Sequence, residues 1–153
     1  MFLNPFHKLT AVAVVMSVAP QIAAADCSTV SGTIAATVIG GEPLNVLGTV
    51  YGDLAGATRA VVLGQSANDD GTVGLKLAHD FATHDRGTLK TEDSSVWTPV
   101  PGHAGLFHMA TDYTIVGGSG QFAGASGHLM NDGIADTNTG LVTLRYDGEV
   151  CTK

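Results

Sequence analysis

The chain has 153 residues, with 14 Asp and Glu against 7 Lys and Arg and a formal net charge of −7 at pH 7. An acidic chain without a basic patch is a poor partner for nucleic acid or for anionic lipid. Its length suits one domain with one hydrophobic core and is too short for two.

Residues 1–25 have the pattern of a secretory signal peptide. Lys8 supplies a positive charge, residues 9–18 form an apolar core, and three alanines at 23–25 form a small-residue cleavage site. The apolar run is about half the ~20 residues that a membrane-spanning helix needs, so we expect no membrane anchor. The sequence therefore predicts an exported protein, periplasmic or extracellular.

The predicted mature domain, residues 26–153, holds both cysteines of the chain, Cys27 and Cys151. An oxidising compartment favours a single disulfide between them, and the alternative is a pair of buried free thiols. A disulfide would place the first and last strands side by side. Closure of a barrel requires that arrangement, and it removes the exposed sheet edges.

This domain has the composition of an all-β protein, because β-branched segments alternate with Gly-rich turns and no segment keeps a 3.6-residue apolar period. About eight strands would close a single antiparallel β-barrel. We find no internal repeat. In chain order, the predicted strands are 29–39, 45–53, 58–64, 71–82, 88–91, 95–100, 106–116, 123–131 and 141–150.

The stretch 113–127 is the most informative part of the sequence. Residues 114–116 are β-branched and suit a strand, and the glycines among 117–120 permit the positive φ values of a chain reversal. Phe122 then supplies one large apolar anchor. A nucleotide-binding loop would need a helix directly after the glycines, and residues 123–136 contain too many Gly and Asn for one. We therefore expect no cofactor.

The segment Gly117-Gly-Ser-Gly-Gln-Phe-Ala-Gly-Ala-Ser-Gly127 resembles the Gly-Gly-Thr-Gly-x-Phe-x-x-Ala-x-Gly signature of dirigent proteins and of the wider allene oxide cyclase-like β-barrel superfamily. Weaker similarities come before it in the same order, at Asp53-Leu54, at 62–65, and at 75–81 followed by 87–89. The resemblance implies a closed barrel that holds an apolar ligand and acts without a cofactor, as a cyclase, an isomerase or a stereochemistry-guiding protein.

Two positions depart from the family pattern. Asp53 lacks the Asp, Pro and Thr that accompany it in dirigent proteins, and Ala123 stands where the family usually has an arginine of its ligand-guiding site. The resemblance therefore implies a barrel of this superfamily and an apolar ligand rather than a named reaction.

Three residues are candidate catalytic groups: Asp53, His79 and Asp112. In the strand 73–81 the odd positions are apolar apart from His79, which therefore lies on the apolar face. There it could move a proton near neutral pH, and the alternative is a neutral histidine held by backbone hydrogen bonds. Asp53 is a candidate because the resemblance to dirigent proteins includes it.

Asp112 and His108 lie on one face of the strand 106–116, which we predict to line a wet cavity. They are about 13 Å apart along the strand and cannot pair directly. The alternative places His108 in solvent and Asp112 against a turn. Aromatic side chains could form the walls of a ligand site or simply fill the core; with His108, the candidate ligand-binding residues are Tyr51, Trp97, Phe107 and Tyr146.

The five histidines of the mature domain lack the short spacings of a zinc site, so we expect no metal. The sequence predicts an exported barrel that binds an apolar small molecule, and the alternative is a non-catalytic periplasmic or secreted binding or structural module. Both remain open, as does whether the protein is an enzyme. Strand 106–116 is also apolar on both faces, which with the resemblance predicts a homo-oligomer, a trimer.

Overall fold

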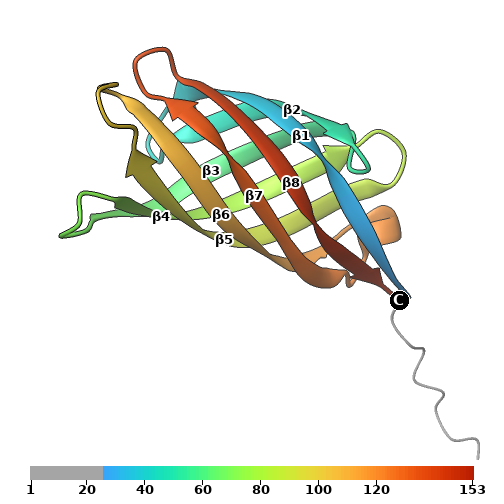
Figure 1. Cartoon of the computed structure of the whole chain (residues 1–153). Coiled ribbons are helices and arrows are strands. Elements are labelled where there is room, and N and C mark those ends of the chain that lie inside the picture. Colours follow the sequence, from blue (N-terminus) through green and yellow to red (C-terminus); the bar gives the residue numbers. More distant parts are fainter. Residues whose placement is uncertain (1–25) are drawn as a thin grey trace, which may run out of the picture.

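The computed structural model describes residues 26–153, so the predicted signal peptide at 1–25 lies outside the described residues. Eight antiparallel strands form one closed barrel, in which each strand pairs with its neighbours in sequence and the last pairs with the first (Figure 1). This confirms the predicted fold class. The elements are β1 (Asp26–Gly40), β2 (Asn45–Gly52), β3 (Gly56–Ala67), β4 (Val73–Thr83), β5 (Gly87–Pro99), β6 (Leu106–Gly118), a 3₁₀ turn η1 (Gly120–Phe122), β7 (Ser126–Asp136) and β8 (Leu141–Thr152).

The strand β5 corrects the sequence prediction. Segments 88–91 and 95–100 were predicted as two strands, with Glu92, Asp93 and Ser94 left outside both. In the structure they are one continuous strand, with Asp93 pointing inward and Glu92 and Ser94 outward. The barrel tolerates an acidic side chain there because its interior supplies a partner for the carboxylate.

The chain reversal predicted at the glycines occurs between β6 and β7. Gly120 has a φ of +61°, and a Cβ on Gly118 would lie 2.1 Å from the backbone oxygen of Thr88. Both positions therefore require glycine. Phe122 is buried as predicted, and the turn continues past it, so β7 begins at Ser126 rather than at residue 123.

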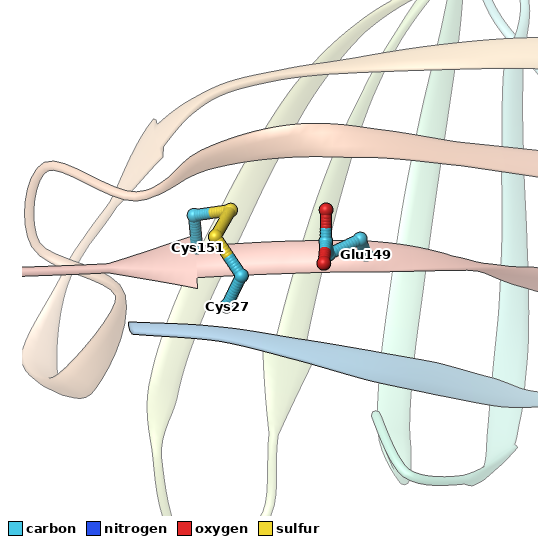
Figure 2. Close-up of side chains that lie close together, drawn as sticks. All are labelled: Cys27, Glu149 and Cys151. Atoms are coloured by element: carbon cyan, nitrogen blue, oxygen red, sulfur yellow. A yellow bond between two sulfur atoms is a disulfide. The ribbon is translucent and has the colours of Figure 1, made fainter. Parts of the chain in front are cut away.

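Cys27 and Cys151 lie opposite each other in the β1–β8 register and form a disulfide (Figure 2). The alternative of two free thiols is wrong. The bond joins residues 124 positions apart in the sequence, so it fixes the seam at which the barrel closes.

The two ends of the barrel differ. The turns at 53–55, 84–86 and 119–125 gather at one end with the disulfide, and the loops at 41–44, 68–72, 100–105 and 137–140 gather at the other. We call the corresponding parts the packed half and the open half. Within residues 26–153 no helix is long and apolar enough to cross a membrane.

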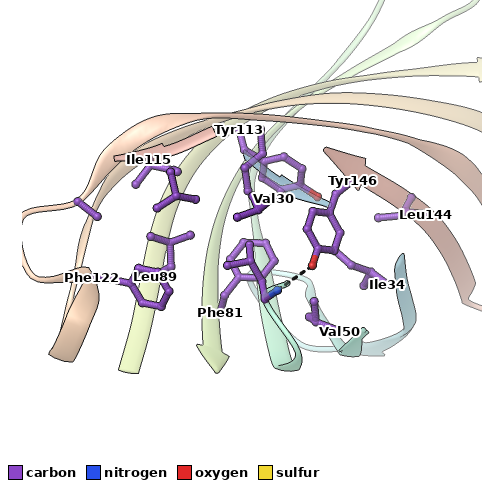
Figure 3. Packing of buried hydrophobic residues seen from close by; sticks show 14 of the residues in the cluster. Val30, Ile34, Val50, Phe81, Leu89, Tyr113, Ile115, Phe122, Leu144 and Tyr146 are labelled. Carbon is purple, nitrogen blue, oxygen red and sulfur yellow. Dashed lines mark hydrogen bonds between the residues drawn. The ribbon is translucent and has the colours of Figure 1, made fainter. Parts of the chain in front are cut away.

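Large side chains fill the packed half (Figure 3). Tyr146 shows how the half is held together, because its hydroxyl donates to the backbone oxygen of Tyr51 and accepts from the backbone N–H of Leu54, each at 3.0 Å. Gly32 leaves room for this ring, since a Cβ there would lie 2.7 Å from it. The inward side chains of this half are Val30, Val50, Leu54, Phe81, Leu89, Ile115, Phe122, Leu129, Tyr146 and Val150.

Candidate functional site: the interior cavity

The open half contains a cavity of about 360 Å³. This volume lies in the range of small-molecule sites, about 300–1,000 Å³. Its walls are mostly aliphatic and aromatic. The polar side chains among its lining residues are Thr58, Gln65, His79, Thr111, Tyr113, Asn131 and Thr137.

The cavity exists because the inward positions of the open half carry short side chains. Ala36, Ala60 and Val62 face the cavity from β1 and β3. At the other end of the barrel, the larger side chains of Phe81 and Tyr146 fill the interior. The number of strands sets the barrel's width, so shortening the inward side chains leaves space inside rather than a narrower barrel.

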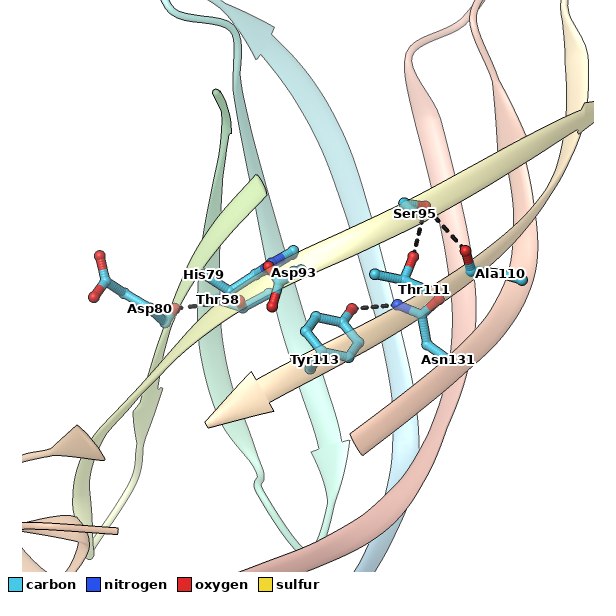
Figure 4. Close-up of polar contacts among 9 residues, drawn as sticks. All are labelled: Thr58, His79, Asp80, Asp93, Ser95, Ala110, Thr111, Tyr113 and Asn131. Atoms are coloured by element: carbon cyan, nitrogen blue, oxygen red, sulfur yellow. Dashed lines mark hydrogen bonds and ion pairs between the residues drawn. The ribbon is translucent and has the colours of Figure 1, made fainter. Parts of the chain in front are cut away.

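The side chains of His79 and Asp93 are in contact beside the cavity, with 2.6 Å between the imidazole Nδ1 and the carboxylate Oδ2 (Figure 4). The Asp93 side chain is fully buried and that of His79 is 10% exposed. A carboxylate at Nδ1 holds the proton on that nitrogen and leaves Nε2 as the acceptor.

The placement of His79 on the inward face confirms the sequence prediction. The alternative, a histidine held by backbone hydrogen bonds, is wrong, because its partner is the buried carboxylate of Asp93. Sequence analysis missed Asp93 because it placed residues 92–94 in no strand. The signal that would have found it is the unbroken alternation along β5, in which Leu89, Thr91 and Ser95 are buried on the same face.

Tyr113 lies next to this pair, with its ring centroid 5.0 Å from that of His79 in an edge-on arrangement. The amide nitrogen of Asn131 donates a hydrogen bond to the Tyr113 hydroxyl oxygen. Burial raises the pKa of Tyr113 well above its ordinary value and the Asp93 charge raises it further, whereas the Asn131 hydrogen bond lowers it. The phenol therefore stays protonated at neutral pH. Neither residue was a predicted site residue.

Four buried polar atoms have no hydrogen-bond partner within residues 26–153: Thr91 Oγ1, Asp93 Oδ1, Trp97 Nε1 and Asn131 Oδ1. Trp97 and Asn131 belong to the cavity wall. Burying such a group without a partner costs about 1–3 kcal/mol, and native proteins contain few of them. Thr91 and Asp93 are not lining residues, so their unpartnered atoms lie behind the cavity wall.

The predicted ligand-binding residues divide between the interior and the surface. Trp97 and Phe107 line the cavity, with ring centroids 5.7 Å apart. Tyr146 belongs to the packed half, and Tyr51 is 55% exposed. Asp53, a candidate catalytic group, lies at the surface of the packed half. There its carboxylate accepts a hydrogen bond from the Ser31 backbone N–H at 2.8 Å.

The prediction that the His108 and Asp112 face lines a wet cavity is wrong. Both side chains lie on the outer face of β6, where His108 contacts Asp132 at 2.8 Å and Asp112 contacts His128 at 3.4 Å. The opposite face, which carries Met109, Tyr113 and Ile115, turns inward because burying apolar surface outweighs enclosing these charges.

Cys27, Glu149 and Cys151 lie close together at the end of the packed half (Figure 2). The metal ligand among cysteine forms is the thiolate, and both sulfurs here belong to the disulfide. This cluster therefore offers a metal one exposed carboxylate, and we assign it no metal site.

No protein-family model matches the sequence, and no curated protein matches it. Among solved structures, a pterocarpan synthase dirigent protein is similar at 16% sequence identity and a TM-score of 0.37, covering 90% of this chain and 97% of that chain. A likeness at this level assigns neither a family nor an activity.

Proposed function

We propose that the barrel binds one small, largely apolar molecule in the cavity of its open half. The observation that carries this proposal is an interior space of about 360 Å³ whose walls are mostly apolar and include a few polar side chains. Covering apolar wall stabilises a complex by about 25 cal/mol per Å². Pairing Trp97 Nε1 or Asn131 Oδ1 would add to that and fix the ligand's orientation.

The polarity of the wall defines the ligand further. Leu75, Phe107 and Val142 offer apolar contacts, whereas His79 and Tyr113 place polar atoms on the wall. The best match is an apolar body that carries a hydroxyl or carbonyl group. A cavity that holds such a molecule in one conformation could guide a cyclisation or isomerisation without a cofactor. The second candidate, a non-catalytic binding module, uses the same cavity.

Export is part of this proposal. The disulfide between Cys27 and Cys151 fits an oxidising compartment, either the periplasm or the extracellular space.

The cavity supplies its own probe, since Trp97 is the single tryptophan of the chain and lies in the wall. We expect naphthalene and 2-naphthol to change Trp97 fluorescence in a saturable, one-site titration. Ala60→Phe and Ala36→Leu should weaken binding by about tenfold or more, because they fill the cavity. The matched control is Ala110→Phe on the outer face of β6.

Circular dichroism would verify that each variant folds. Wild-type affinity in both cavity-filling variants, or no response of Trp97 to either probe, would contradict the proposal. Mass spectrometry of ligand recovered with the native protein would separate the two candidates, because a chemically transformed ligand excludes pure binding.

A further inference from the structure

Four side chains gather at one side of the cavity, at the junction of the two halves: His79, Asp93, Tyr113 and Asn131 (Figure 4). We call them the polar floor. They come from four consecutive strands, β4 to β7, whose inward positions meet inside the barrel. An apolar cavity of this size could be lined without any of them, and a fully buried carboxylate costs stability.

The polar floor presents a proton acceptor to the cavity. Asp93 engages Nδ1 of His79, and among the described residues no hydrogen bond engages Nε2. The carboxylate also stabilises the imidazolium that forms when Nε2 takes a proton. Asp93 and Tyr113 are the titratable groups that face His79, while β3 contributes the uncharged Thr58 and Ala60.

The polar floor also presents a proton donor. Among residues 26–153 the Tyr113 hydroxyl takes part in one hydrogen bond, in which it accepts from Asn131. Its own proton has no acceptor among the described residues, and a shift of this fully buried side chain would present that proton to a ligand. The His79 and Tyr113 ring centroids are 5.0 Å apart and both residues line the cavity, so a small ligand on this side of the cavity lies beside both rings.

We propose that the polar floor catalyses proton transfer on an apolar, enolisable ketone. His79 Nε2 removes a proton from the carbon next to the carbonyl, and the C–H electron pair forms the C=C bond of an enolate. The enolate oxygen takes the negative charge and accepts a hydrogen bond from Tyr113. The imidazolium then returns the proton to the same carbon or to its conjugated neighbour, so no oxidant, reductant or cofactor enters the balance.

In this scheme His79 and Tyr113 are catalytic residues, and Asp93 and Asn131 are positioning residues. Asp93 fixes which nitrogen of His79 is the base, and Asn131 fixes the Tyr113 hydroxyl. The inference rests on the proposed function, because the ketone must first occupy the cavity.

The test uses 2-tetralone, an apolar bicyclic ketone, with the purified chain in D₂O. We expect the protein to accelerate deuterium exchange of the α-protons, followed by NMR, and His79→Gln to lower the bound-state rate by about 10²–10⁴-fold. Tyr113→Phe should lower it by about 10²-fold. Asp93→Asn should shift the pH profile of the rate as well as lower it, which a merely structural role of Asp93 would not do.

A second readout does not depend on a folded His79 variant. 4-Nitrophenol changes colour when it ionises, and its phenolate resembles an enolate. In the wild-type cavity we expect its apparent pKa to fall by about one unit, equivalent to about tenfold more phenolate at a given pH. The control ligand 4-nitroanisole has no acidic proton and should bind the wild type without a pH-dependent change of colour.

The outcomes separate the two proposals. If 2-tetralone changes Trp97 fluorescence but its exchange is not accelerated, or is equally fast in His79→Gln, the acid–base inference is overturned and the binding function stands. If neither 2-tetralone nor 4-nitroanisole enters the cavity, the binding function fails and the acid–base inference fails with it.

Discussion

The packed and open halves of the barrel are built from the same eight strands, with the same inward–outward alternation, yet they differ in what fills them. Phe81, Leu129 and Tyr146 close the interior at one end, whereas Ala36 and Ala60 leave it open at the other. The difference shows that the backbone of a closed barrel sets the enclosed volume, and that side-chain size decides where the volume becomes core and where it becomes a site.

The two halves meet at Tyr113. Its ring packs edge-on against Phe81, with centroids 6.0 Å apart, and its hydroxyl belongs to the polar floor. Burial of this side chain is the main cause that raises the pKa of the phenol above its ordinary value. We therefore expect changes in the packed half to affect stability and changes in the open half to affect ligand binding.

The largest expected effect on stability comes from removing the disulfide at the end of the packed half. Changing both Cys27 and Cys151 to Ser should lower the free energy of unfolding by about 4–5 kcal/mol, because the bond closes a loop spanning nearly the whole barrel. The thermal midpoint should fall by on the order of 10 °C or more. Calorimetry measures both quantities, and chemical reduction of the wild type should match the double variant.

The affinity of the double cysteine variant for naphthalene shows whether loss of the disulfide also affects the cavity. Below its unfolding transition the double variant should bind within about twofold of wild type, since the disulfide does not line the cavity. A folded double variant that has lost binding would show that the two halves are not separable.

A pair of leucine truncations compares the halves directly. Leu129→Ala in the packed half should destabilise the protein by about 4 kcal/mol, because it opens a new cavity in close-packed surroundings. Leu75→Ala should cost only about 2 kcal/mol, since its side chain already borders empty space. Urea unfolding followed by circular dichroism measures both. Equal losses would mean that the open half is packed as tightly as the other.

Unfolding at alkaline pH tests whether Tyr113 is buried where the two halves meet. Burial raises the pKa of Tyr113, so the unfolded chain releases that proton first, near pH 10. The stability that Tyr113 contributes is then fully present below about pH 10 and is lost as pH rises toward its folded pKa. Between about pH 8.5 and about pH 11 the loss should be about 1.4 kcal/mol.

Tyr113→Phe should remove that part of the pH dependence, and Tyr51→Phe at the exposed tyrosine is the matched control. Some slope should persist in Tyr113→Phe, because burial also raises the pKa of Tyr146. An unchanged slope in Tyr113→Phe would show that the phenol is not buried in solution.

The sequence predicted the barrel because alternation, turn glycines and the two cysteines are local signals that agree with one another. The site was predicted in part. His79 was placed correctly because its strand is otherwise apolar at odd positions, whereas Asp93 was missed because residues 92–94 were placed in no strand. Which face of β6 turns inward depends on all eight strands, so the polar pattern at His108 and Asp112 pointed to the wrong face.

The smallest effect on stability is expected on the outside of the barrel, where the predicted trimer can be tested. The outer face of β6, predicted to be an apolar contact face, is interrupted by the pairs that His108 and Asp112 form with residues of β7. Exposed leucines also lie on the outer faces of β8 and β2, on either side of β1. There Thr37 stands opposite both Leu47 and Leu141, and Leu141 is 58% exposed.

We therefore expect the β8–β1–β2 face to be the contact between copies. Leu47→Lys with Leu141→Lys should change the unfolding free energy of the single barrel by no more than about 0.5 kcal/mol, since neither side chain enters the core. Light scattering should show the mass falling to that of one chain, because charges on an apolar contact face oppose association. Met130→Lys, equally exposed on β7, should leave the mass unchanged, and a wild type that is monomeric at high micromolar concentration would end the prediction.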